Sequence, residues 1–478
     1  MRIRPTILWT LSSLLGCLIA SSAAADSFDV RGPPVRGRNA FVFVGASMAD
    51  AQGLDNGVNC LFTQKSLQLS AAQLPTRAKI VEAVLYIGGS LLDDGLDYTD
   101  PSLEIFSTPN LSYDDPSNVE QLDALARAAA DRTVSFQPPG ASAPVVVTGK
   151  TPAVTGFYVP PGPTGEGGNV AFFVTPIDVT DVIRDEGNGI LAGTYTVSDL
   201  TADVCNGLEA VCDDPPNPPT CLTMSQLHTR GAASFALLLI VEDPALPLTS
   251  ISIFEGLQTI SGFQVSVDLQ PGSSISNPAQ GSLGIYALEG DLSIGRVDDT
   301  MMSPPCHAEE FIYVDGDLDP ADSGGCLTDA DNPLGNIFNA TINQQPALNE
   351  APFCTRDPIL CCRSAAECGD ACVVCGETGV DIDQFDISQT LEPGATSINV
   401  RVGSGTDRIA TATMVLSVSI FEPVLSLDSQ IRVLDAVNGL LRLGDTFEYS
   451  IAISNTGNVN QCRNYLRVAG PPSRTQLS

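Results

Sequence analysis

The residues best suited to bind an ion are four aspartates in one loop, which reads DGDLDPAD. Alternate carboxylates in a glycine-containing loop can converge on one Ca²⁺, which prefers several hard oxygen ligands. The loop departs from the EF-hand pattern, because its glycine comes early and Cys326 stands where that pattern has glutamate. A solvated acidic loop tied down by neighbouring cysteines is the alternative interpretation. The candidate calcium ligands are Asp315, Asp317, Asp319 and Asp322.

Cysteine is the second distinctive residue type, with 14 in the chain. The densest group ends in C-x₃-C-x₂-C spacing, which zinc or an iron–sulfur centre could also use. In an exported chain an oxidising environment favours disulfides over metal, and spacing alone does not fix their pairing. The candidate disulfide cysteines are Cys205, Cys212, Cys221, Cys306, Cys326, Cys354, Cys361, Cys362, Cys368, Cys372 and Cys375.

Acid–base and nucleophilic catalysis have few candidates. The only histidines are His228 and His307, and neither lies in a nucleophile elbow or a metal motif. Glu242 and Asp243 could form a glycosidase pair, but they follow an apolar run and precede a proline, which favours a strand that ends at a turn. No catalytic residue is assigned, and we expect a protein that is not an enzyme and has no cofactor other than calcium.

The N-terminus predicts export. A basic start, an apolar run over 6–20 and small residues before Asp26 are typical of a secretory signal peptide over residues 1–25. The alternative is a lipid anchor at Cys17, because LLGC approximates a lipoprotein box. No later segment has the ~20 apolar residues of a membrane span, so we expect a secreted, extracellular or cell-surface protein without a transmembrane span.

Charge and composition restrict the partners and the fold. The formal net charge of −33 argues against nucleic acid and anionic membrane surfaces, because phosphate binding needs clustered basic residues. Charged residues make up only 17% of the chain, whereas glycine (42) and proline (34) are frequent. This composition favours many short strands and turns. One short amphipathic helix is predicted over Val119–Arg132.

The elements that would position these residues are predicted to be strands. The segment Ala233–Pro244 contains an apolar run typical of a central strand buried on both faces, and Ser250–Phe254 is expected to complete the core hairpin. A similar run, Ala410–Pro423, suggests a second edge of the same sandwich. The predicted fold is mainly β: a large antiparallel, jelly-roll-like β-sandwich over 26–423, with Cys-rich loop insertions at about 203–223 and 299–376.

The C-terminal segment resembles a known family. Residues 427–458 contain Asp435, the pairs NG and GD, Tyr449 and the sequence NTGN, and they resemble the start of the DUF-eleven conserved surface repeat. The resemblance implies a partial, incomplete Ig-like repeat over 424–478. The order of elements over 80–423 resembles the N-terminal module found ahead of such repeats, which implies a bacterial, adhesin-like surface protein without catalytic residues.

These observations lead to one functional expectation and two rivals. We expect a non-catalytic secreted or cell-surface protein with a structural or adhesion role toward a surface, matrix or protein ligand that the sequence does not identify. The first rival is a Ca-assisted glycan- or protein-binding module, and the second is an extracellular hydrolase.

Overall fold

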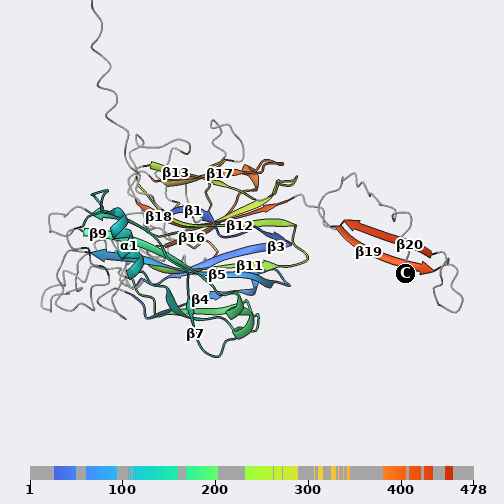
Figure 1. Ribbon diagram of the computed structural model, residues 1–478, viewed down its shortest axis with the longest axis horizontal. Coiled ribbons are helices and arrows are strands. Elements are labelled where there is room, and N and C mark those ends of the chain that lie inside the picture. Colours follow the sequence, from blue (N-terminus) through green and yellow to red (C-terminus); the bar gives the residue numbers. More distant parts are fainter. Residues whose placement is uncertain are drawn as a thin grey trace, which may run out of the picture.

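The computed structural model (Figure 1) describes most of the region between residues 26 and 455. The described residues are 26–49, 61–93, 106, 108, 111–159, 168–202, 232–261, 263–271, 273–288, 306, 310–315, 325–329, 332, 337–338, 342–344, 380–404, 408–420 and the backbone of 425–433 and 447–455.

Antiparallel strands build every sheet, which confirms the mainly β class. The six-stranded sheet has the order β1 (Asp26–Val30), β12 (Thr249–Ile260), β18 (Ile409–Ser419), β14 (Gly281–Leu288), β16 (Val380–Asp386), with β2 (Val35–Gly37) also paired to β12. The five-stranded sheet has the order β3 (Asn39–Ser47), β11 (Ala233–Glu242), β5 (Lys79–Asp93), β9 (Gly168–Asp178), β8 (Ala153–Val159).

Two smaller sheets flank this central pair. The four-stranded sheet has the order β4 (Gln64–Leu69), β10 (Gly193–Ser198), β6 (Thr133–Gln137), β7 (Val145–Thr148). The three-stranded sheet has the order β13 (Phe263–Leu269), β17 (Ile398–Ser404), β15 (Glu310–Asp315). Figure 1 shows the resulting stack, with β13 and β17 at one end, the two central sheets in the middle and β4 and β7 at the other end.

Three apolar cores separate the four layers, and β11 shows why the chain stacks in this way. Leu237 and Leu239 belong to the core shared with the four-stranded sheet, whereas Leu238 and Ile240 belong to the core shared with the six-stranded sheet. Successive side chains of a strand point to opposite faces, so an unbroken apolar run needs cover on both. The prediction of a central strand buried on both faces is therefore confirmed.

The predicted core hairpin is wrong. β11 pairs with β3 and β5, whereas β12 pairs with β18, β1 and β2 in the facing sheet. The turn after β11 therefore carries the chain from one sheet to the other. Apolar alternation reports which faces of a strand are covered and not which strand lies beside it. The second predicted edge is wrong for the same reason, because β18 lies between β12 and β14.

One helix covers an end of the five-stranded sheet. The predicted amphipathic helix is present as α1 (Val119–Ala129), which buries Leu122 and Ala126 and packs on β8 and β9. Within the described residues, no helix is long and apolar enough to cross a membrane.

The C-terminal segment forms a two-stranded hairpin. β19 (Leu425–Val433) and β20 (Phe447–Asn455) pair in register from Leu425 with Asn455 to Val433 with Phe447. Figure 1 shows this hairpin set apart from the stacked sheets. The domain boundary at 424 stays a prediction.

Candidate functional site

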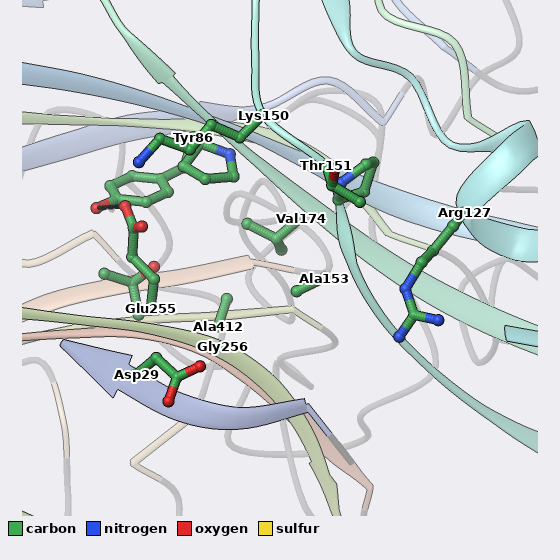
Figure 2. Close-up of a pocket in the computed structure, with 13 residues that line it drawn as sticks. Asp29, Tyr86, Arg127, Lys150, Thr151, Ala153, Val174, Glu255, Gly256 and Ala412 are labelled. Atoms are coloured by element: carbon green, nitrogen blue, oxygen red, sulfur yellow. Dashed lines mark hydrogen bonds between the residues drawn. The ribbon is translucent and has the colours of Figure 1, made fainter. Parts of the chain in front are cut away.

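A cleft lies between the two central sheets and has a volume of about 430 Å³ (Figure 2). Small residues line the middle of the cleft. Ala153, Gly256 and Ala412 leave space there that longer side chains would fill. β12 and β18 lose register between Glu255 and Gln258, and such a bulge bends a strand locally. The cleft therefore opens beside one of the irregular parts of the six-stranded sheet.

Polar side chains reach the cleft from six different parts of the chain. Figure 2 shows Tyr86 and Glu255 close together, with Asp29 on β1 below them and Arg127 extending from α1. The polar residues that line the cleft include Asp29, Tyr86, Arg127, Lys150, Glu255 and Thr413.

A network of charges holds the base of the cleft together. The Arg31 guanidinium pairs with Glu255 at 2.5 Å and with Glu82 at 3.1 Å, and its side chain is only 8% exposed. The Tyr86 hydroxyl donates a hydrogen bond of 3.1 Å to the same Glu255 oxygen. These contacts join β5 of the five-stranded sheet to β12 and to the segment after β1.

The network sets the protonation of its members. Burial and the neighbouring Glu255 carboxylate raise the pKa of Tyr86 well above its usual value, so this phenol stays protonated. Burial is the largest single influence on Arg31 and would lower its pKa, but the attractions of Glu255 and Tyr86 and the hydrogen bonds to Glu255 and Glu82 together outweigh it, so the pKa is raised. Glu255 therefore serves as the acceptor of a fixed ion pair and hydrogen bond.

Other polar groups face the cleft with capacity left for a ligand. Thr413 is fully buried, and its hydroxyl oxygen has no hydrogen-bond partner. Lys150 and Asp29 are exposed at the rim and carry opposite charges. A buried hydroxyl without a partner costs free energy, which a ligand that hydrogen bonds to it would recover. The arrangement suits a neutral, hydrogen-bonding ligand better than a highly charged one.

The aspartates predicted to bind calcium lie at the limit of the described chain. Asp315 ends β15, and only its backbone is described. Asp317, Asp319 and Asp322 lie outside the described residues, so the predicted calcium loop stays a prediction. In the part of the chain that the structure describes, no group of three or more His, Cys, Asp or Glu side chains is arranged to hold a metal ion.

Two of the predicted disulfide cysteines are described. Cys306 and Cys326 form a disulfide with an S–S distance of 2.07 Å, next to the buried rings of Phe311 and Tyr313 on β15. The remaining candidates, which lie outside the described residues, are Cys205, Cys212, Cys221, Cys354, Cys361, Cys362, Cys368, Cys372 and Cys375.

Asp243 has a structural role at the end of β11. Its carboxylate accepts hydrogen bonds from the backbone N–H groups of Ala245 and Arg77, and it pairs with the Arg77 guanidinium at 3.1 Å. These hydrogen bonds, that from Ala245 first, lower the pKa of Asp243. The carboxylate closes the turn between the central sheets, as the sequence predicts.

Sequence reasoning missed the residues of the cleft. Arg31 lies in a Pro- and Gly-rich segment that reads as an extended arm, and Thr413 lies within an apolar strand. Arg31 is one of three arginines between residues 31 and 38 of a very acidic chain, and this cluster of positive charge is the signal that could have drawn attention to an ion pair. Neither Glu82 nor Glu255 differs in local sequence from the many other acidic residues.

Comparison with known proteins gives no match for this chain among protein-family models, curated proteins or solved structures.

Proposed function

We propose that this protein is a non-catalytic, exported surface protein that acts by adhesion, and that it holds its ligand in the cleft between the central sheets. The observation that carries the proposal is the buried Thr413 hydroxyl, which lines the cleft and has no hydrogen-bond partner. The cleft therefore offers the Thr413 hydroxyl as a donor or acceptor at its base. Lys150 and Asp29 place one charge of each sign at its opening.

The contacts of Glu255 support binding rather than turnover. A general acid or base must be free to reach the reacting atoms and exchange a proton with them during each cycle. The Glu255 carboxylate pairs with Arg31 at 2.5 Å and accepts a hydrogen bond from Tyr86 at 3.1 Å through the same oxygen. A carboxylate held in this way is suited to fix the two sheets and poorly suited to transfer protons.

The cleft also favours one class of ligand. Hydroxyl-rich glycans present many neutral donors and acceptors, which match a threonine hydroxyl flanked by isolated charges. This favours the glycan-binding form of the rival function, in which calcium assists binding. The predicted signal peptide over 1–25 and the surface-repeat resemblance of residues 427–458 support the extracellular setting of either role.

A glycan array probed with the full chain tests the proposal. We expect retention of hydroxyl-rich glycans by the wild-type protein. Removing one neutral hydrogen bond costs about 0.5–1.5 kcal/mol, so Thr413→Val should weaken binding roughly 2- to 12-fold. Lys150→Ala should also weaken binding, whereas Lys79→Ala, which removes an exposed lysine outside the cleft, should not.

Two results would contradict the proposal. Equal binding by wild type and both cleft variants would place the ligand elsewhere. Release of products from a bound glycan, abolished in Glu255→Gln, would favour the extracellular hydrolase instead.

A further inference from the structure

A second polar site lies in the layer between the six-stranded and three-stranded sheets. Asp381 and Asp383 of β16 are both fully buried. Val380 and Ile382 of the same strand belong to the core on the side of the five-stranded sheet, so the two aspartates point the other way. Phe385, next on that side, belongs to the core shared with the three-stranded sheet. Two carboxylates thus lie side by side in an apolar layer.

Among the described residues that influence the pKa of Asp383, none carries a positive charge. Burial, and next the charge of Asp381, raise the pKa of Asp383 well above its usual range, and the hydrogen bonds from Asn332 and Asn343 only partly oppose this. One carboxylate oxygen of Asp383 accepts from the Asn343 backbone N–H at 3.2 Å, and the other, Oδ2, has no hydrogen-bond partner. A buried carboxylate in this state lacks compensation for its lost hydration.

A third oxygen lies across the same face of the sheet. Ala287 of β14 is paired with Asp381 on one side and with Thr411 of β18 on the other. Residues paired directly across antiparallel strands point to the same face. Thr411 is fully buried and its hydroxyl oxygen also has no hydrogen-bond partner. Because the side chain between them is only a methyl group, the face is recessed between Asp381 and Thr411.

Three described residues that precede β16 in sequence, Asp329, Asn332 and Asn343, form a covering segment beside the aspartate pair and are joined by hydrogen bonds of their own. Asp329 accepts from the Asn332 backbone N–H at 2.8 Å and from the Asn343 side-chain amide at 3.1 Å. The Asn343 amide oxygen in turn accepts from the backbone N–H of Gln384, which follows Asp383 on β16. The covering segment therefore brings amide groups to the pair from a fixed position.

We propose that Asp381 and Asp383 bind one Ca²⁺ ion, with the Thr411 hydroxyl, neighbouring amide or backbone oxygens and water as the neutral ligands. Ca²⁺ accepts about six to eight oxygen ligands in flexible geometry, and carboxylates supply the charge that offsets its dehydration. Hard oxygen donors of this kind do not favour zinc or copper. Two carboxylates provide fewer charged ligands than a three-carboxylate cluster, so neutral oxygens must complete the shell. This site is distinct from the predicted loop at Asp315–Asp322.

Thermal unfolding of the full chain, first in EDTA and then with 1 mM CaCl₂, tests the proposal without any glycan. A ligand that binds only the folded state raises Tm, and for a micromolar site in a chain of this size we expect a rise of about 5 °C. Asp383→Asn should abolish this rise. It should also unfold at a higher temperature than wild type in EDTA, because folding buries the Asp383 carboxyl group without full compensation for its lost hydration and the variant removes that group.

The control is Asp386→Asn, which removes an exposed carboxylate from the same strand and should keep the full calcium response. Asp381→Asn provides a second variant of the site. Titration calorimetry should detect a heat of calcium binding in wild type that is lost in both variants. An unchanged Tm of wild type on adding calcium would overturn the proposal. A response that survives in Asp381→Asn and Asp383→Asn but is lost on Asp317→Asn with Asp319→Asn would overturn it as well, by placing the ion in the loop.

Discussion

Replacing Arg31 with methionine should destabilise the protein strongly, because one side chain forms two ion pairs between the central sheets. Arg31 contacts Glu82 and Glu255, whose side chains are 27% and 18% exposed. At an effective dielectric constant of about 20, unit charges about 3 Å apart attract by roughly 5 kcal/mol before desolvation is subtracted. Methionine fills similar volume but leaves both carboxylates without their partner.

The net effect is smaller than this gross attraction. Breaking a buried pair by removing one partner costs about 3–5 kcal/mol, and part of this cost is relieved where water reaches the remaining charges. Both glutamates keep some exposure, so we expect a loss of about 3 kcal/mol in the free energy of unfolding, at the lower end of that range. The N-terminal strand β1, which the pair anchors, should show faster amide hydrogen exchange than β11.

Urea denaturation of wild type and variant measures the change. The matched control is Arg184→Met, which breaks the exposed pair of Arg184 with Asp181 (50% and 82% exposed) and should cost less than about 1 kcal/mol. A double-mutant cycle with Glu255→Gln isolates the pairwise energy. If Arg31→Met costs no more than Arg184→Met, the charge network does not hold the sheets together and the reasoning is refuted.

Three further outcomes are expected. Leu238→Ala should cost about 2–5 kcal/mol in urea denaturation, since this residue is fully buried between the central sheets; a smaller loss would indicate a loosely packed core. A Gly88→Ala variant should lower Tm, because its Cβ would lie 2.6 Å from the Tyr286 hydroxyl; an unchanged Tm would show that the ring moves freely. Asp243 has a lowered pKa, so its contribution to stability is present above the unfolded value of about 3.9 and lost as pH falls through the folded value. On acidification below pH 5, the Tm of the Asp243→Asn variant should therefore fall less than the Tm of wild type. An equal fall in Tm for the two proteins would contradict this.

Local sequence predicted elements well where burial is periodic. The strand at Ala233–Glu242 and the helix at Val119–Ala129 were both predictable, because each has an apolar pattern with a single structural solution. Strand partners were not predictable in this way. β11 and β12 are adjacent in sequence and lie in facing sheets, because the turn at Asp243 is held by Arg77 from a distant part of the chain.

The cleft and the buried aspartate pair could not be predicted from the sequence either. Asp381 and Asp383 alternate with apolar residues, and this pattern alone is typical of a strand with one solvated face. In the part of the chain that the structure describes, the three-stranded sheet packs on that face and buries it. Thr413 likewise becomes a cleft residue because β18 faces β5 across the central layer.

The sequence by itself determined the mainly β class, the short helix and the strand buried on both faces, since these depend on the spacing of apolar residues along one segment. It also carries the export signal and the surface-repeat resemblance, which stay predictions. The tertiary structure alone decided the stacking of four sheets, the cleft and the buried aspartate pair. These depend on which distant segments meet, and a charge gains or loses its partner only through that meeting: Arg31 reaches Glu255 across 224 positions of sequence.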